Sequence, residues 1–295
     1  MNCLIITNGY GLADGILHQL KRLKEELALR NISFDVIKNN KAIVFIDENG
    51  DLKSSLKPYD FIIYLDKDRF VARSLEKLGY KLFNNALSIE LCDDKMLTHI
   101  ALANNGIKMP KTISSTLCYR DDGNRDIVND VIQNIGLPLI VKENYGSLGR
   151  QVYLINTKEE LIEISNRLIH TPHLYQQFIE SSKGIDYRII VINHKVVAYM
   201  KRENKHSYLS NIAQGGTSSS IVELPQAYLD TAIKCSVVLG LDYCGVDILQ
   251  GKNNEPIVSE VNSNAFYEGI EKTTNINVAG AYVDHIINKI KNEHA

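Results

Sequence analysis

The stretch Asp247–Asn262, which reads DILQGKNNEPIVSEVN, decides the fold of this chain. Apolar residues dominate 246–249 and 256–261, and the polar run 252–255 between them has turn chemistry, so two β-strands joined by a turn are predicted. Glu260 and Asn262 lie two residues apart, which places their side chains on one face, where Asp247 of the paired strand can join them. Two carboxylates and an amide oxygen are hard ligands that suit Mg²⁺ with phosphates completing its shell. A solvated hairpin with ordinary surface charges is the alternative that the spacing leaves open.

Length and composition set the class of protein. The chain has 295 residues, enough for two or three domains or lobes, and its 44% hydrophobic and 23% charged residues are typical of a globular protein. The formal net charge of -2 argues against a nucleic-acid or membrane-surface binder, because both require a cationic field. No apolar run approaches the ~20 residues that cross a bilayer, and the N-terminus does not resemble a signal peptide.

Cysteine usage indicates a reducing compartment. The cysteines are scattered and form no CxxC pair, so neither a zinc site nor a disulfide framework is predicted. Reduced thiols of this kind fit a cytoplasmic location. They are Cys3, Cys92, Cys118, Cys235 and Cys244.

The first 85 residues alternate between strand and helix patterns. Apolar runs at 3–7, 34–37 and 60–65 predict strands, helical spacing over 16–29 and 70–78 predicts helices, and 42–52 predicts a hairpin. This alternation predicts a small, mostly parallel α/β domain. The charged run 66–69 follows a strand end, where ligand sites of such domains often lie, although a solvated charge run explains it equally well. The loop 8–14 has neither GxGxxG nor a P-loop lysine.

The following segments contain candidate phosphate ligands. Helical spacing predicts one helix over 88–105, with Asp94 and Lys95 in its middle. A strand over 139–142 ends in Lys142, and the loop that follows contains glycine and serine, so a cation and backbone N–H groups can cover phosphates.

The second half of the chain adds arginines near predicted strands. Strands are predicted at 173–179, 189–192 and 196–200, with Arg188 and Arg202 at their ends, and helices at 226–239 and 278–290. Arginine suits a transferring phosphoryl group because its planar fork offers paired donors and stays charged. The histidines and cysteines show no HExxH, Ser-His or Cys-His pattern, so nothing in the sequence favours a protein nucleophile.

These motifs, in this order, resemble the ATP-grasp ligases, and most closely their RimK-type branch, typified by the ribosomal-protein glutamate ligase. The run 260–279, EVNSNAFYEGIEKTTNINVA, is similar to that branch's EVN…EGIE.TT.I…A string, and the resemblance covers about residues 82–290. It implies the ATP-grasp fold, which belongs to the α/β class and is built from lobes that each combine helices with a sheet (α+β). The implied division is a pre-ATP-grasp α/β domain over 1–85 and an ATP-grasp domain over 86–295, with a lid subdomain at about 112–178 and a metal-binding subdomain at about 179–295.

The resemblance also implies roles for individual residues. Arg188 and Arg202 stabilise the charge of an acyl-phosphate, and Asp247, Glu260 and Asn262 hold Mg²⁺ or Mn²⁺. The residues implied to bind ATP are Lys95, Lys142, Gly146, Ser147, Gln176, Gln177, Phe178, Ile179, Asp186, Ser210 and Asn211.

The implied activity is amide formation between a carboxylate and an amine, with an amino acid joined to a peptide or small acceptor through an acyl-phosphate. A dipeptide or glutathione-like ligase acting on free amino acids is one alternative, and a non-catalytic ATP-binding regulatory protein is another. Nucleic-acid and membrane partners are not expected. Family members often form homodimers or homotetramers, and the apolar residues of the first lobe permit such assembly.

Three positions depart from the family's pattern. Gln151 replaces the last glycine of the lid motif, which the family writes GS.G.GV. Leu209 and Gln214 stand where the family has arginine. The loss of two cations disfavours a substrate with an acidic side chain.

Overall fold

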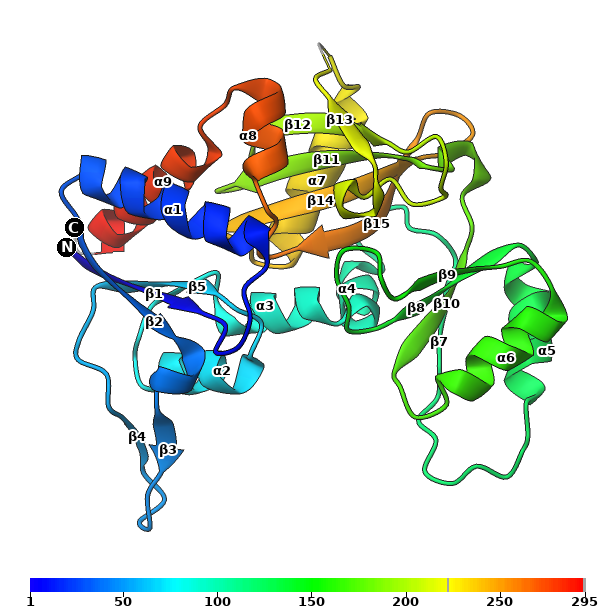
Figure 1. The fold of residues 1–295 in the computed structure, drawn as a ribbon, viewed down its shortest axis with the longest axis horizontal. Helices are drawn as coiled ribbons and strands as arrows, with labels where there is room; N and C mark the ends of the chain where they lie inside the picture. Colours follow the sequence, from blue (N-terminus) through cyan, green and yellow to red (C-terminus); the bar gives the residue numbers. More distant parts are fainter. Residues whose placement is uncertain (222, 294–295) are drawn as a thin grey trace.

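The N-terminal lobe is a parallel sheet with helices packed against it, as predicted. The computed structural model describes residues 1–221 and 223–293. The sheet has the strand order β2-β1-β5-β6 and lies at the left of Figure 1. Its elements are β1 (Asn2–Thr7), α1 (Asp14–Leu29), β2 (Ser33–Lys38), η1 (Asn39–Lys41), β5 (Phe61–Leu65), α2 (Arg69–Lys77) and β6 (Leu82–Phe83).

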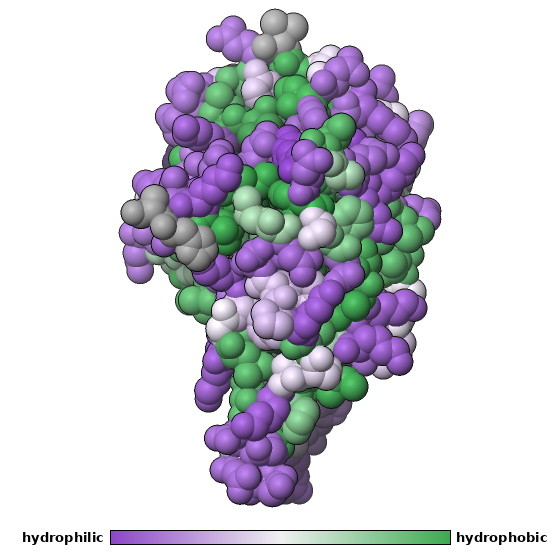
Figure 2. Space-filling view, turned by 90° about the vertical axis from the view of Figure 1, so that its left-hand side faces the viewer, coloured by the Kyte–Doolittle hydropathy of each residue, from purple (hydrophilic) through white to green (hydrophobic). Residues whose placement is uncertain are grey.

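A hairpin projects from this lobe. It consists of β3 (Val44–Ile46) and β4 (Leu52–Ser54), which pair antiparallel, so the prediction of a hairpin here is confirmed. Ile43 and Ile46 at its base and edge are 55% and 71% exposed. The side of the molecule that carries the hairpin shows apolar side chains scattered among hydrophilic ones (Figure 2).

The helix predicted over 88–105 is wrong in one respect, because the chain forms two helices there. These are α3 (Ala86–Asp93) and α4 (Lys95–Leu102). Asp94 between them has an extended backbone, and its carboxylate accepts hydrogen bonds from the backbone N–H groups of Met96 and Leu97. Asp94 is therefore the N-cap of α4, and Lys95 opens that helix instead of lying in the middle of a longer one.

The second sheet lies at the right of Figure 1 and has two helices on one face. Its antiparallel strands follow the order β7-β10-β8-β9. Val131 and Leu161 of the helices pack with Leu139 and Tyr175 of the sheet. The elements are β7 (Thr112–Ser114), α5 (Asp126–Ile135), β8 (Leu139–Glu143), β9 (Val152–Ile155), α6 (Lys158–Arg167) and β10 (His173–Gln177).

The third sheet is five-stranded and antiparallel, with the order β13-β12-β11-β14-β15. Helix α7 packs on one face, where Ile189, Val246 and Val261 are fully buried. Helices α8, α9 and α1 cover part of the other face (Figure 1). The elements are η2 (Glu180–Ser182), β11 (Ile185–Ile192), β12 (Lys195–Glu203), η3 (Ile212–Gln214), β13 (Thr217–Ser219), α7 (Gln226–Val238), β14 (Tyr243–Gln250), β15 (Pro256–Asn262), α8 (Glu268–Thr274) and α9 (Val278–Glu293).

Two predicted strands are longer than expected. β11 begins at Ile185, so Asp186 and Arg188 lie within it, and β12 extends to Glu203, so Arg202 is also a strand residue. Asp186 faces Arg202 across the ladder, and Arg188 faces Asp247 of β14. These charged residues therefore lie on neighbouring strands of one sheet, which the predicted strand ends did not indicate.

The N-terminal lobe and the five-stranded sheet are joined by a common core and by Asn84. Leu23 of α1 and Ile286 of α9 belong to one buried apolar cluster. The buried Asn84 amide donates hydrogen bonds to the carbonyls of Tyr243 and Ser263, at 2.7 and 2.8 Å. The domain boundary near residue 85 stays a prediction.

None of the helices within the described residues has the length and apolar character that a membrane span requires.

Candidate active site

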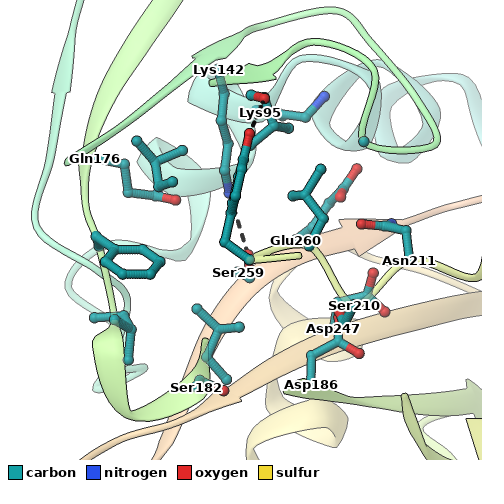
Figure 3. A pocket seen from close by; sticks show the side chains of 18 of the residues that line it. Lys95, Lys142, Gln176, Ser182, Asp186, Ser210, Asn211, Asp247, Ser259 and Glu260 are labelled. Carbon is teal, nitrogen blue, oxygen red and sulfur yellow. Dashed lines mark hydrogen bonds between the residues drawn. The ribbon is translucent and has the colours of Figure 1, made fainter. Parts of the chain in front are cut away.

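A cavity lies between the β7-β10-β8-β9 sheet and the five-stranded sheet (Figure 3). All of the predicted ATP-binding residues line it, and so do Asp247 and Glu260. These residues come from α4, β8, the loop after β8, β10, β11, the loop after β12, and the β14–β15 hairpin. The fold thus brings together side chains that are far apart in the sequence.

Lys142 is the buried cation of this cavity. It lies on β8, is 9% exposed, and its ammonium donates a hydrogen bond to the Ser259 hydroxyl at 3.3 Å. Burial lowers the pKa of Lys142 to about 8, and Lys95 adds to this effect while Glu260 and Asp247 oppose it. A buried ammonium with few partners is well suited to bind an anion.

Lys95 lies at the edge of the cavity next to the loop after β8. Its ammonium donates hydrogen bonds to the carbonyl oxygens of Gly146 at 2.9 Å and Asn144 at 3.4 Å. The Asn144 amide donates to the Asp94 carboxylate at 3.0 Å. The break between α3 and α4 therefore fixes both Lys95 and the start of the loop.

The departures from the family's pattern all contact this loop. A Cβ atom added at Gly146 would lie 2.7 Å from the Gln151 Oε1 atom, so the Gln151 side chain folds back over the loop. The Gln214 amide donates to the Leu148 carbonyl at 2.9 Å, and Leu209 packs against Gly149. The Gln214 side chain thus holds the loop by a hydrogen bond, and none of the three neutral side chains adds charge to the cavity.

The far end of the cavity is formed by 176–179, which link β10 to the five-stranded sheet. The buried Gln176 amide donates to the Thr112 hydroxyl at 2.9 Å and lies 3.0 Å from His99 Nε2. His99 is 6% exposed, and burial, together with the charge of Lys142, lowers its pKa to about 4.

We expect His99 to make the protein less stable in acid. The unfolded chain protonates His99 near pH 6.5 and the folded chain near 4, so this contribution is complete above about pH 6.5 and is lost as the pH falls toward 4. The loss between pH 7 and 4.5 is about 2 kcal/mol of unfolding free energy. Urea unfolding at both pH values should show a smaller loss in His99→Gln than in the wild type. An equal loss in the two proteins would contradict a neutral, buried His99.

Four charged residues form a buried network beside the cavity. The Arg202 guanidinium donates to Asp186 at 2.7 Å and to Asp247 at 3.0 Å, and Arg188 donates to Asp247 at 2.8 and 2.7 Å. Although burial alone would raise it, the two arginines lower the pKa of Asp247 to about 2. The two positive and two negative charges cancel, so Asp247 stays ionised in a buried place.

The β14–β15 hairpin contains a β-bulge that the period-two rule did not predict. Asp247 pairs with Glu260 and Ile248 with Val258, so Ser259 has no ladder partner among the described residues. Val258 and Val261 both enter the core under α7, while Ser259 and Glu260 both line the cavity. The bulge thus adds a residue to the site. The one signal of this bulge in the sequence is Ser259 itself, a polar residue at a position that regular alternation assigns to the apolar face.

The oxygen donors of the hairpin fit a divalent cation. Among the described residues, Glu260 accepts no hydrogen bond and forms no ion pair, so its carboxylate is available to a cation. Asp247 lies opposite Glu260, and Asn262 lies opposite Gly245, so the register places the three on one face. No group of three or more His, Cys, Asp or Glu side chains within 1–221 and 223–293 has metal-site geometry, so this set relies on an amide oxygen. Carboxylate and amide oxygens suit Mg²⁺ and similar hard cations.

Comparison with known proteins shows the family of this chain. The profile of the RimK-like ATP-grasp domain matches residues 92–286. The chain belongs to the RimK-like ATP-grasp family. A probable alpha-L-glutamate ligase of Vibrio vulnificus (strain YJ016) is 35% identical over 285 residues, which cover 92% of this chain and 91% of the relative. The chain is thus an ATP-dependent ligase that joins a carboxylate to an amine, rather than a non-catalytic nucleotide-binding protein.

Solved structures confirm the predicted ATP-grasp fold. A RimK domain ATP-grasp protein from Sphaerobacter thermophilus has a TM-score of 0.74 at 18% identity, with 97% of this chain and 99% of that one covered. The ATP-grasp ligase PsnB, complexed with minimal precursor, Mg and ADP, has a TM-score of 0.69 at 16% identity, with 98% of each chain covered. At identities of 18% and 16%, this similarity shows the fold alone.

Proposed function

We propose that the ligase uses ATP and Mg²⁺ to join an amino acid to a peptide or small acceptor through an acyl-phosphate. The observation that carries this proposal is the pair of lysines, Lys95 and Lys142, in one cavity with the oxygen donors Asp247 and Glu260. Anionic phosphates between the two groups would satisfy the lysines directly and the carboxylates through a cation. The complex of the ATP-grasp ligase PsnB with a precursor peptide supports a peptide as one class of substrate.

The nucleotide would lie along the cavity from the linker to the hairpin. We assign the adenine to the wall formed by Gln176, Gln177, Phe178 and Ile179, since backbone groups of a linker can read a base edge. The phosphates would contact Lys95, Lys142 and the backbone N–H groups of the loop at Gly146 and Ser147. Asp186, Ser210 and Asn211 complete the wall near the five-stranded sheet.

The cation site would be formed by Asp247, Glu260 and Asn262, with Asp247 shared with the arginines. When bound there, Mg²⁺ or Mn²⁺ would neutralise phosphate charge. We assign to Arg188, whose side chain is 14% exposed and is held by Asp247, the stabilisation of charge on the transferring phosphoryl group. Arg202 is more deeply buried, at 3%, and through Asp186 and Asp247 it holds the network in place.

The proposed reaction has two steps. A carboxylate oxygen of the first substrate attacks the γ-phosphorus of ATP, and the bond to the β–γ bridging oxygen breaks to release ADP. The amine of the second substrate then attacks the acyl carbon and loses a proton, and phosphate leaves with the oxygen that came from the carboxylate. The protein positions the reactants and stabilises charge, so no protein nucleophile is required.

Phosphate release from ATP with Mg²⁺ tests this proposal. The reaction would be screened against single amino acids, pairs of amino acids and a peptide mixture, with products identified by mass spectrometry. We expect release that requires one amino acid and a second component, with neutral amino acids favoured over acidic ones because Leu209 and Gln214 supply no cation. ATP binding without release or product in any combination would contradict it.

Lys142→Ala should weaken ATP binding about 10- to 100-fold, because a charge-assisted hydrogen bond to a buried phosphate contributes roughly 1.5–3 kcal/mol. Isothermal titration calorimetry with ATP measures this change. Lys201→Ala, on β12 outside the cavity, is the matched control and should leave the affinity unchanged. Unchanged affinity in Lys142→Ala would remove Lys142 from the nucleotide site.

Homo-oligomeric assembly and a cytoplasmic location stay predictions from the sequence.

A further inference from the structure

Ser259 brings a hydroxyl group into the cavity next to Glu260. Regular alternation along β15 would turn Ser259 toward the core under α7, and the bulge instead turns both residues to the cavity side. Figure 3 shows Ser259 and Glu260 close to each other, with the Lys142 side chain extending from the opposite wall to the Ser259 hydroxyl. β-Bulges are common next to active sites, where they turn a side chain toward the site.

The hydrogen bond between Lys142 and Ser259 joins two separate sheets. Lys142 belongs to the β7-β10-β8-β9 sheet and Ser259 to the five-stranded sheet. The bond is 3.3 Å long. Among the described residues, Ser259 is the one hydrogen-bond partner of the Lys142 ammonium. Its geometry therefore determines where this charge lies relative to the hairpin.

Lys142 has a competing partner in Glu260. A lysine ammonium is a point charge on a flexible stem, and attraction between opposite charges is strong in a buried place. Glu260 attracts Lys142, yet the two side chains form no ion pair in the described structure. The Ser259 hydroxyl accepts a hydrogen bond from the ammonium and leaves both charges available.

We propose that Ser259 is a positioning residue that keeps the Lys142 ammonium directed at the nucleotide phosphates and away from the Glu260 carboxylate. Without the hydroxyl, Lys142 would pair with Glu260, and both phosphate binding and cation binding would weaken. The proposal rests on the assignment of the cavity to ATP under Proposed function. It adds a role for a residue that belongs to this chain's own hairpin bulge.

Calorimetry with ATP and with adenosine, in the presence of Mg²⁺, tests the proposal. Ser259→Ala should weaken ATP binding about tenfold, because the ammonium loses its acceptor, and should leave adenosine binding unchanged. Ser259→Thr keeps the hydroxyl and should restore most of the ATP affinity. Ser219→Ala, an exposed serine on β13, is the matched control and should behave as the wild type.

A double-mutant cycle separates positioning from direct contact. If Ser259 acts through Lys142, adding Ser259→Ala to Lys142→Ala should cause no further loss of ATP affinity. Additive losses would overturn the proposal, since Ser259 would then contact the nucleotide or its cation directly. Unchanged ATP affinity in Ser259→Ala, or an equal loss for adenosine, would also overturn it. A wild-type protein that binds no ATP would instead refute the proposed function.

Discussion

Glu260→Gln is expected to lower the rate of ATP turnover by on the order of 10³-fold, since losing a cation ligand removes several kcal/mol of transition-state stabilisation. The change keeps the size of the side chain and removes its charge. Because Glu260 forms no ion pair among the described residues, the fold should be retained. The measurement is phosphate release under the conditions that give turnover in the wild type, combined with thermal unfolding.

The control for this variant is Glu163→Gln on α6, an exposed residue outside the cavity. It makes the same chemical change and should keep wild-type turnover. Near-wild-type activity in Glu260→Gln would remove the proposed cation site. A large fall in the unfolding temperature would show that Glu260 supports the fold, in which case the lost activity would not report on a cation.

Arg202→Met should reduce the free energy of unfolding by about 3–5 kcal/mol, because it leaves the buried Asp186 without its partner and leaves Asp247 with Arg188 alone. Asp186 and Asp247 are 5% and 3% exposed, and Arg202 contacts both of them. The methionine keeps much of the volume, so loss of the charge is the main change. Urea unfolding at pH 7 measures the effect.

Lys201→Met is the matched control, since Lys201 precedes Arg202 on the same strand and its side chain is 30% exposed. Its loss of stability should stay below about 1 kcal/mol, as for a surface ion pair. If Arg202→Met cost no more than Lys201→Met, the network of Asp186, Arg202, Asp247 and Arg188 would not stabilise the fold.

The sequence predicted the family, the fold class and the face of the hairpin that carries the oxygen donors. The period-two rule holds for Glu260 and Asn262 because residues two positions apart in a regular strand point to the same face. The order of the motifs was sufficient to identify the RimK-like ATP-grasp family, which the comparisons confirm. The roles of the individual site residues stay predictions until the variants are measured.

Other features depend on contacts that no local pattern encodes. The bulge at Ser259 follows from how β14 and β15 pair, and a shift of one residue turns a side chain to the other face. Asp94 ends one helix and starts the next because its carboxylate caps α4, although the apolar spacing continues through the break. The roles of Leu209 and Gln214 as contacts of the loop after β8 became visible only when 209–214 was placed against that loop.

The most direct test of the central claim is the transfer of ¹⁸O from substrate to phosphate. The carboxylate of each component selected by the phosphate-release screen would be labelled with ¹⁸O in a separate reaction, and the phosphate and nucleotide products would be analysed by mass spectrometry. An acyl-phosphate mechanism predicts one ¹⁸O atom in phosphate for each amide bond formed when the component that supplies the carboxylate is labelled, with unlabelled ADP. Amide formation with ¹⁸O in AMP, or with no label in phosphate from either component, would contradict it.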